Sequence, residues 1–306
     1  MTNAQRVVLV TGASTGIGRC IAGRLAAAGH RVYAGARKPA DLQALDAMAN
    51  VEALALDVGD PAQVAAAVQR IAADQGALHG LVNNAGIGGL GPLVSWTDAE
   101  LQQLFDTNVF GPLRLARECL PLLLAGRGRI VHIGSQGGSI TSRWYGPYTA
   151  TKHALEALAQ CQRDELAAHG IGVSIVQPGG VVSQVGANAM AGTAARFERT
   201  PPPFDAEARA VLQAWRDAPG YDPALPESAA NRRLSPPDDV AVAVAHALFD
   251  PAPRLRYLVG TRWEGQRVLD NLLQRLLDAN DGAAMQYTPA ELHALLDRHL
   301  AARAAP

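Results

Sequence analysis

Short apolar runs alternate with amphipathic helical stretches along the chain, and no other sequence feature limits the fold as much. The runs are apolar on both faces, which is typical of strands buried between two layers of helices. They lie at residues 6–11, 31–36, 51–56, 78–83, 129–134, 173–177 and 256–259. The pattern predicts an α/β fold with a doubly wound parallel sheet of about seven strands, covered on both faces and joined by right-handed crossovers.

Helical spacing fills the segments between these strands. Helices are expected at residues 17–28, 61–75, 97–124 and 147–169, with a break near Asn108. The regularity then stops, and residues 184 to about 235 hold the triplet Pro201-Pro202-Pro203 and scattered helical pieces. Because unusually long loops in compact domains are often functional, this segment is predicted to be a lid. A helix resumes after Ser235, its expected cap, and runs to Phe249.

The last part of the chain has a different pattern. Residues 1–262 are expected to form a single catalytic domain that includes the lid, and residues 263–306 a C-terminal helical extension. The extension carries an apolar stripe of Leu269, Leu272, Leu273, Leu276 and Leu277. Thr288 and Glu291 then form a predicted capping box. The stripe is expected to pack on the catalytic domain or on a second subunit. Binding to a membrane surface is the alternative, which the acidic residues of this segment disfavour.

Composition excludes several classes of function. The formal net charge of −1 argues against a nucleic-acid-binding protein, which usually carries a basic excess. No apolar run approaches the roughly 20 residues of a membrane span, and the run at residues 7–10 is too short for a secretion signal, so we expect a cytoplasmic protein. Cys20, Cys119 and Cys161 are far apart, and neither they nor the eight histidines show the spacing of a metal site.

A Gly-rich turn between the first strand and the first helix holds Gly12, Gly16 and Gly18. Such glycines let a pyrophosphate approach the helix N-terminus, where free N–H groups favour anions. A turn of this kind also occurs where strand and helix merely pack closely. Its position directly after the first strand favours dinucleotide binding.

Further motifs follow in order along the chain. They are Asn83-Asn84-Ala85-Gly86, Asn108, Ser135, the stretch from Tyr148 to Lys152, and Pro178-Gly179. With the Gly-x-x-x-Gly-x-Gly turn, this ordered set resembles the short-chain dehydrogenase/reductase family over about residues 6–262. The resemblance implies a Rossmann-like fold, a nicotinamide cofactor, and hydride transfer between the cofactor and an alcohol or ketone.

Tyr148 and Lys152 are predicted to share one face of a helix, because they are four residues apart. A neighbouring ammonium would favour the phenolate and bring the Tyr148 pKa toward the working pH. The alternative is that both lie on a helix surface without a function. The chain has 27 basic residues, of which only Lys38 and Lys152 are lysines, so a surface cation here would be expected to be Arg.

Two further catalytic roles follow only from the family resemblance. Ser135, at the end of the fifth strand, would orient the substrate carbonyl. Asn108 would interrupt its helix and support a proton relay through water to Lys152. Taken alone, Ser135 would be read as a turn residue and Asn108 as a polar packing residue. No metal is expected in the site.

The resemblance also implies a set of cofactor-binding residues. They are Gly12, Ser14, Gly16, Ile17, Gly18, Arg37, Lys38, Asp57, Val58, Asn84, Ala85, Gly86, Tyr148, Lys152, Pro178, Gly179 and Val181. The second strand ends at Ala36, where NAD-specific relatives usually place an acid, and two cations follow it. These cations could meet a 2′-phosphate, so NADP(H) is favoured and NAD(H) remains possible.

The motifs together predict an NADP(H)-dependent oxidoreductase acting on a secondary alcohol or ketone. The lid shows few obvious paired charges, which favours a lipophilic or weakly polar substrate. A non-catalytic NAD(P)(H)-binding regulator is the alternative, and a Rossmann-like methyltransferase is a weaker one. Trp144 and Tyr145 could line the substrate pocket or pack against the lid. Family members commonly form dimers or tetramers through the two long helices, so a homodimer or homotetramer is expected.

Overall fold

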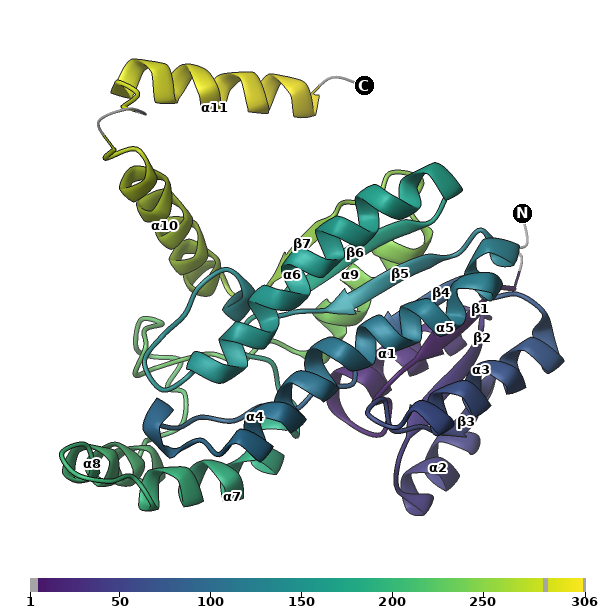
Figure 1. Cartoon of the computed structure of the whole chain (residues 1–306), viewed down its shortest axis with the longest axis horizontal. Helices are drawn as coiled ribbons and strands as arrows, with labels where there is room; N and C mark the ends of the chain where they lie inside the picture. The colour runs from purple at the N-terminus through teal and green to yellow at the C-terminus, as the bar shows by residue number, and fades with distance from the viewer. Residues whose placement is uncertain (1–4, 283–285, 305–306) are drawn as a thin grey trace. The chain divides into compact units, whose positions relative to one another are not determined.

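Seven parallel strands form one sheet in the order β3-β2-β1-β4-β5-β6-β7 (Figure 1). The computed structural model describes residues 5–282 and 286–304. The strands are β1 (Val7–Val10), β2 (Arg31–Ala36), β3 (Val51–Ala55), β4 (Gly80–Asn83), β5 (Arg129–Ile133), β6 (Gly172–Pro178) and β7 (Arg256–Val259). The strand order reverses between β1 and β4, so the predicted doubly wound, Rossmann-like topology is confirmed.

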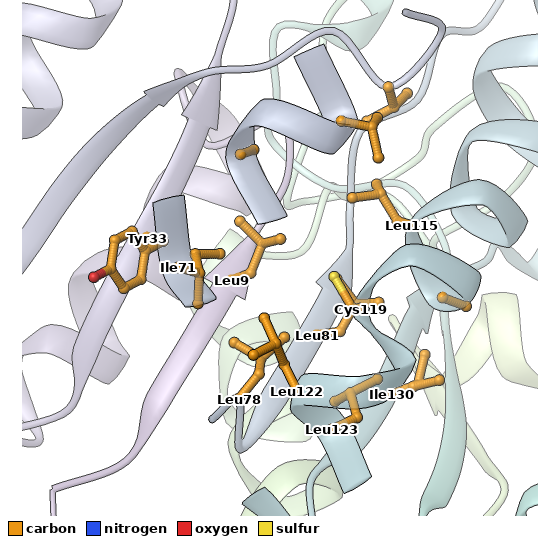
Figure 2. Close-up of a cluster of buried hydrophobic side chains, with 14 of the residues drawn as sticks. Leu9, Tyr33, Ile71, Leu78, Leu81, Leu115, Cys119, Leu122, Leu123 and Ile130 are labelled. Atoms are coloured by element: carbon orange, nitrogen blue, oxygen red, sulfur yellow. The ribbon is translucent and has the colours of Figure 1, made fainter. Parts of the chain in front are cut away.

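Helices cover both faces of the sheet and bury its apolar side chains (Figure 1). The helices preceding the C-terminal extension are α1 (Gly16–Ala27), α2 (Pro39–Asp46), α3 (Pro61–Gln75), α4 (Asp98–Phe105), α5 (Gly111–Gly126), α6 (Gly146–Leu166), α7 (Val185–Glu198), α8 (Asp205–Arg216) and α9 (Pro237–Phe249). On one face Leu9 packs with Ile71 of α3 and Leu115 of α5 (Figure 2). On the other face α1 and α9 lie together and contribute Ile21 and Val244. Each fully buried aliphatic side chain of this kind stabilises the fold by about 1.5–3 kcal/mol.

The predicted break near Asn108 is a π-helical turn at Asp106–Phe110, between α4 and α5. The Asn108 side chain is buried there and bonds outside its own helix. A π-turn inserts one residue into the helical repeat and re-aims the side chains that follow it, often at functional sites. This turn explains why the long predicted helix is two helices.

Two local predictions need correction, and one helix was missed. Helix α2 was not predicted from the sequence. The lid is more regular than expected, because α7 and α8 occupy much of it. Ser235 does not cap α9, whose N-cap is Pro236. Ser235 instead extends a short ladder with the chain after β6: its N–H donates to Gly180 O at 2.8 Å, and its carbonyl accepts from Val182 N at 3.0 Å.

The chain divides into two compact units, residues up to Gly265 and residues from Gln266 onward. The second unit holds most of α10 (Arg262–Ala279) and all of α11 (Pro289–Ala304). The predicted capping box is present at the start of α11, where Thr288 N–H donates to Glu291 Oε2 at 2.7 Å. The leucines of the predicted stripe are exposed in the structure, and their packing partner stays a prediction. In the described part of the chain, no helix is both long and apolar enough to cross a membrane.

Candidate active site

The turn between β1 and α1 is shaped by glycines. Gly12 and Gly16 have φ angles of +62° and +53°, in the left-handed region that other residues rarely adopt. Gly18 is required for space, because an added Cβ would overlap Gly12 O and the Asn84 side chain. Ser14 and Ile17 lie half-buried in the same turn. The result is a cradle at the N-terminus of α1 that fits a pyrophosphate.

Thr11 locks this cradle to the loop after β4, and sequence reasoning missed it. Its Oγ1 accepts from Asn84 N at 3.0 Å and from Ala85 N at 2.9 Å. In return Asn84 Nδ2 donates to Thr11 O and Gly12 O, each at 2.9 Å. The Cβ that Gly12 lacks would lie 2.8 Å from Ala85 Cα. The only available signal was a Thr that ends an apolar strand immediately before the first glycine.

The ends of β2 and β3 lie side by side at the same edge of the sheet. Ala36 is buried, whereas Arg37 and Lys38 are exposed. Arg37 Nη1 lies 3.5 Å from Asp57 Oδ2, and the Arg37 side chain is 63% exposed. This contact is weak and open to solvent, so the guanidinium can turn toward an anion. Val58, beside Asp57, is buried.

Tyr148, Lys152 and Ser135 meet where β5 ends against α6. Lys152 Nζ lies 5.7 Å from the centre of the Tyr148 ring and donates to Ile133 O at 2.9 Å. Its side chain is buried, unlike most lysines. Ser135 lies hydrogen-bonded to Tyr148, and its Oγ also accepts from Gly137 N at 3.0 Å. Gly86 borders the same space, since an added Cβ would lie 3.8 Å from Lys152 Nζ.

The electrostatics differ from the prediction for Tyr148. Burial raises the pKa of its phenol, although the hydrogen bond with Ser135 acts in the opposite direction. Burial also lowers the pKa of Lys152 to about 8. The expected lowering of the Tyr148 pKa by the ammonium is therefore wrong for the chain by itself. The physical reason is that desolvation disfavours both the phenolate and the ammonium.

Asn108 connects the loop after β4 to α6. Its Oδ1 accepts from Ile87 N at 2.9 Å, and its Nδ2 donates to Ile87 O at 2.9 Å and to Thr151 Oγ1 at 3.1 Å. Thr151 is the neighbour of Lys152 and was not singled out from the sequence. The side chain of Asn108 thus holds together the two segments that border Tyr148.

Pro178 ends β6, and the chain after it closes the other side of the site. Gly179 N–H donates to Val259 O at 2.8 Å, and Val181 pairs with Ser235. A Cβ on Gly179 would overlap the carboxylate of Glu264. The residues expected to bind the cofactor therefore lie at the carboxyl ends of the parallel strands, either on the loops there, at the end of β6 or in the N-terminal parts of α1 and α6. Such sheets bind ligands at this edge.

The two aromatic residues before Tyr148 have different surroundings. The Trp144 ring lies edge-on against Phe197 of α7, with ring centres 5.6 Å apart, so this residue packs against the lid. Its φ of +73° is strained for a tryptophan. The Tyr145 ring lies instead against Tyr148, at 6.3 Å.

The prediction of few paired charges in the lid is wrong. Six ion pairs involve its residues: Arg143–Glu207, Arg196–Glu100, Arg199–Glu100, Arg209–Asp205, Arg216–Glu198 and Arg232–Glu264. Four of the six join residues far apart in the chain, so adjacency in the sequence does not show them. Among residues 5–282 and 286–304, no three His, Cys, Asp or Glu side chains are grouped to hold a metal ion.

Comparisons with known proteins agree with this geometry. Residues 6–193 match the family model for short chain dehydrogenases. The uncharacterized oxidoreductase YbbO of Escherichia coli is 34% identical over 281 residues, covering 88% of this chain and 94% of that protein. A short chain dehydrogenase/reductase from Burkholderia phymatum, solved in complex with NAD, is 25% identical with a TM-score of 0.72, covering 90% of this chain and 94% of that one.

A further solved relative carries the phosphorylated cofactor. It is an actinorhodin polyketide ketoreductase variant with NADPH, which is 28% identical with a TM-score of 0.66 and covers 83% of this chain and 95% of that one. Solved relatives thus hold either dinucleotide. The chain belongs to the short-chain dehydrogenase/reductase family and is an oxidoreductase that acts on CH–OH or C=O groups with a nicotinamide cofactor.

Proposed function

We propose that the chain is an NADP(H)-dependent oxidoreductase that interconverts a ketone and a secondary alcohol of low polarity. The observation that carries the proposal is the group of Tyr148, Lys152 and Ser135 at one edge of the sheet, with Asn108 bonded to Thr151, the neighbour of Lys152. When bound, the cofactor supplies or accepts the hydride.

The protein's own residues handle the proton and the substrate oxygen. Because burial raises the pKa of Tyr148, its phenol is protonated near neutral pH and is ready to donate to a carbonyl oxygen. Ser135, hydrogen-bonded to the same phenol, positions that oxygen. Lys152 holds a cation next to the phenol and reaches the space beside Gly86.

The preference for NADP(H) rests on the end of β2. Gly12, Ser14, Gly16, Ile17 and Gly18 would hold the pyrophosphate, and Asp57 with Val58 the adenine. Arg37 and Lys38 would pair with the 2′-phosphate, since both are exposed and the contact of Arg37 with Asp57 is weak. Asn84, Ala85, Gly86, Pro178, Gly179 and Val181 would surround the nicotinamide half.

A substrate of low polarity is supported by exposed apolar side chains near the start of α6 and on the loop after β6. Leu93 is 70% exposed, and its side chain lies against Gly146, two residues before Tyr148. Leu234 is 51% exposed and lies against Gly180, and Val182, two residues after Gly180 in the chain, is 55% exposed. Exposed apolar side chains beside a polar site are typical of ligand-binding surfaces.

The proposal extends to assembly as a homodimer or homotetramer. Phe110, Leu113 and Leu124 are exposed along the π-turn and α5, one of the two long helices expected at the interface. Exposed apolar side chains along one helix favour a subunit contact.

The test is an absorbance assay of reduced-cofactor consumption with a panel of ketones graded in polarity, run with NADPH and with NADH. We expect turnover with NADPH, with kcat/KM rising with the apolar length of the ketone. Equal or better turnover with NADH would refute the cofactor assignment. Turnover confined to small charged ketones would refute the substrate class.

A further inference from the structure

Glu264 is a buried carboxylate at the start of α10, and its side chain is 1% exposed. Its Oε2 accepts from Thr261 N at 3.3 Å, while its own N–H donates to Thr261 Oγ1 at 3.3 Å. These reciprocal bonds are a capping box. A capping box by itself uses only one carboxylate oxygen and does not require burial.

The second oxygen of Glu264 faces away from the helix. Oε1 accepts from Gly180 N at 2.7 Å and from the guanidinium of Arg232. Gly180 directly follows Pro178-Gly179, and Arg232 lies in the last limb of the lid. One carboxylate oxygen therefore binds two segments separated by about fifty residues of lid.

The two segments also bond to each other above this carboxylate. Ser235 N–H donates to Gly180 O at 2.8 Å and Val182 N–H to Ser235 O at 3.0 Å. Gly179 has no Cβ, and Glu264 Oε2 occupies the space that one would fill. The loop after β6 is thus in direct contact with the carboxylate, so the backbone conformation of this loop depends on the position of the Glu264 side chain.

We propose that Glu264 is a positioning residue that holds the Pro178–Val182 backbone in the shape that receives the nicotinamide end of the cofactor. Through Arg232, the same carboxylate ties the last limb of the lid to that loop. The inference rests on the proposed function, because the loop is taken to border the nicotinamide. It assigns to the first turn of α10 a role in binding that the family motifs do not contain.

The decisive variant is Glu264→Gln, which keeps the shape of the side chain. The carboxylate accepts on both oxygens, whereas an amide accepts on one and donates on the other. The NH2 end of the glutamine amide must therefore face either Thr261 N–H or the N–H donors of Gly180 and Arg232. Because an opposed pair of donors is unfavourable in a buried site, the loop is expected to shift.

Binding of two ligands separates a local effect from a general one. NADPH would contact both halves of the site, whereas 2′,5′-ADP would reach only the half near Arg37 and the Gly-rich turn. Glu264→Gln should weaken NADPH binding about ten-fold, the loss of one charge-assisted hydrogen bond, and leave 2′,5′-ADP binding within about two-fold. Calorimetric titration measures both without turnover.

Glu291→Gln is the matched control, because Glu291 makes the same capping box with Thr288 on α11. It should leave both affinities unchanged. If Glu264→Gln does not fold, Arg232→Met decides, because the Arg232 side chain is 38% exposed and its loss spares the capping box. It should weaken NADPH binding selectively, by a smaller factor.

Equal weakening of NADPH and 2′,5′-ADP, or no weakening of either, would overturn the inference. A wild-type chain that binds neither NADPH nor NADH would instead refute the proposed function. If the wild type prefers NADH, the same comparison with NADH and ADP tests Glu264.

Discussion

The cofactor side and the lid side of this active site are built by different means. The cofactor side is held by the backbone, through the left-handed glycines at 12 and 16 and the exchange of bonds between Thr11 and Asn84. At the lid, the side-chain charges of Arg196, Arg199 and Arg232 add to the short backbone ladder at Ser235 and the packing of Phe197. Backbone sites tolerate almost no added atom, whereas charged contacts weaken gradually when one partner is changed.

This difference predicts sharp losses on the cofactor and catalytic side and graded ones in the lid. The buried Lys152 and the space around Gly18 leave no alternative residue. At the lid, Glu100 of α4 pairs with two lid arginines, so the loss of one leaves the other.

The largest expected effect comes from Lys152→Arg. The guanidinium keeps the charge but not the compact shape that fits beside Ile133 O, so kcat should fall about 1,000-fold. Lys38→Arg is the matched control, because Lys38 is exposed and a phosphate accepts either cation. Steady-state kinetics measure kcat for both variants. Equally small losses of kcat in the two variants would contradict the role of Lys152.

Gly18→Ala tests the backbone cradle. The added Cβ would overlap Gly12 O, so NADPH affinity should fall about 100-fold, or roughly 3 kcal/mol. Gly23→Ala, in the same helix, meets only the end of the Met48 side chain at 3.4 Å and should stabilise the fold by about 0.5–1 kcal/mol. A fluorescence titration measures the NADPH affinity, and thermal melting measures the stability of the fold. Tight NADPH binding by Gly18→Ala would refute the cradle.

The pair Ala36→Asp and Arg37→Ala tests cofactor choice within the cofactor side. The double variant removes a phosphate partner and adds a repulsive carboxylate, so preference should shift toward NAD(H) by about 10- to 100-fold. The measurement is the ratio of kcat/KM for NADPH and NADH. An unchanged ratio would show that the 2′-phosphate is read elsewhere.

Arg196→Met tests the lid. The Arg196 side chain is buried, stacks 3.9 Å from the Trp96 ring centre and bonds Leu90 O at 2.8 Å. Its loss should raise substrate KM a few-fold and lower stability by about 1–3 kcal/mol, with cofactor affinity unchanged. Arg209→Met, which removes an exposed pair within α8, should do neither. Loss of NADPH binding in Arg196→Met would break the contrast between the two sides.

The smallest effect is a pH dependence of the lid contacts. Burial acts to raise the pKa of Glu100, but its bonds with Thr97 and the arginines outweigh this, and the pKa is lowered. The carboxylate therefore stabilises the fold above the unfolded-state pKa, and that contribution is lost as the pH falls through the lower folded value. Melting curves of wild type and Glu100→Gln should differ at pH 7 and converge once the pH has fallen below the lowered pKa of Glu100. A difference that persists in acid would contradict this account.

The same contrast explains how far the sequence could be read. Gly12, Gly16 and Gly18 carry their backbone requirement locally, so the cradle was predictable. The sheet topology was predictable because apolar runs alternate with helical stretches along the chain. Arg196 acts through Glu100, 96 residues away, and Glu264 acts through Gly180, 84 residues away. No local pattern encodes contacts over such separations. The Tyr148 pKa was mispredicted because spacing shows that a lysine is near but not that both side chains are desolvated.

The proposed catalysis depends most directly on the phenol of Tyr148. Tyr148→Phe keeps the ring and removes only the proton, so a parallel measurement of kcat and NADPH affinity separates chemistry from binding. We predict a fall in kcat of about 1,000-fold with NADPH affinity within about two-fold of wild type. A Tyr148→Phe enzyme that turns over at near wild-type rate would contradict the account.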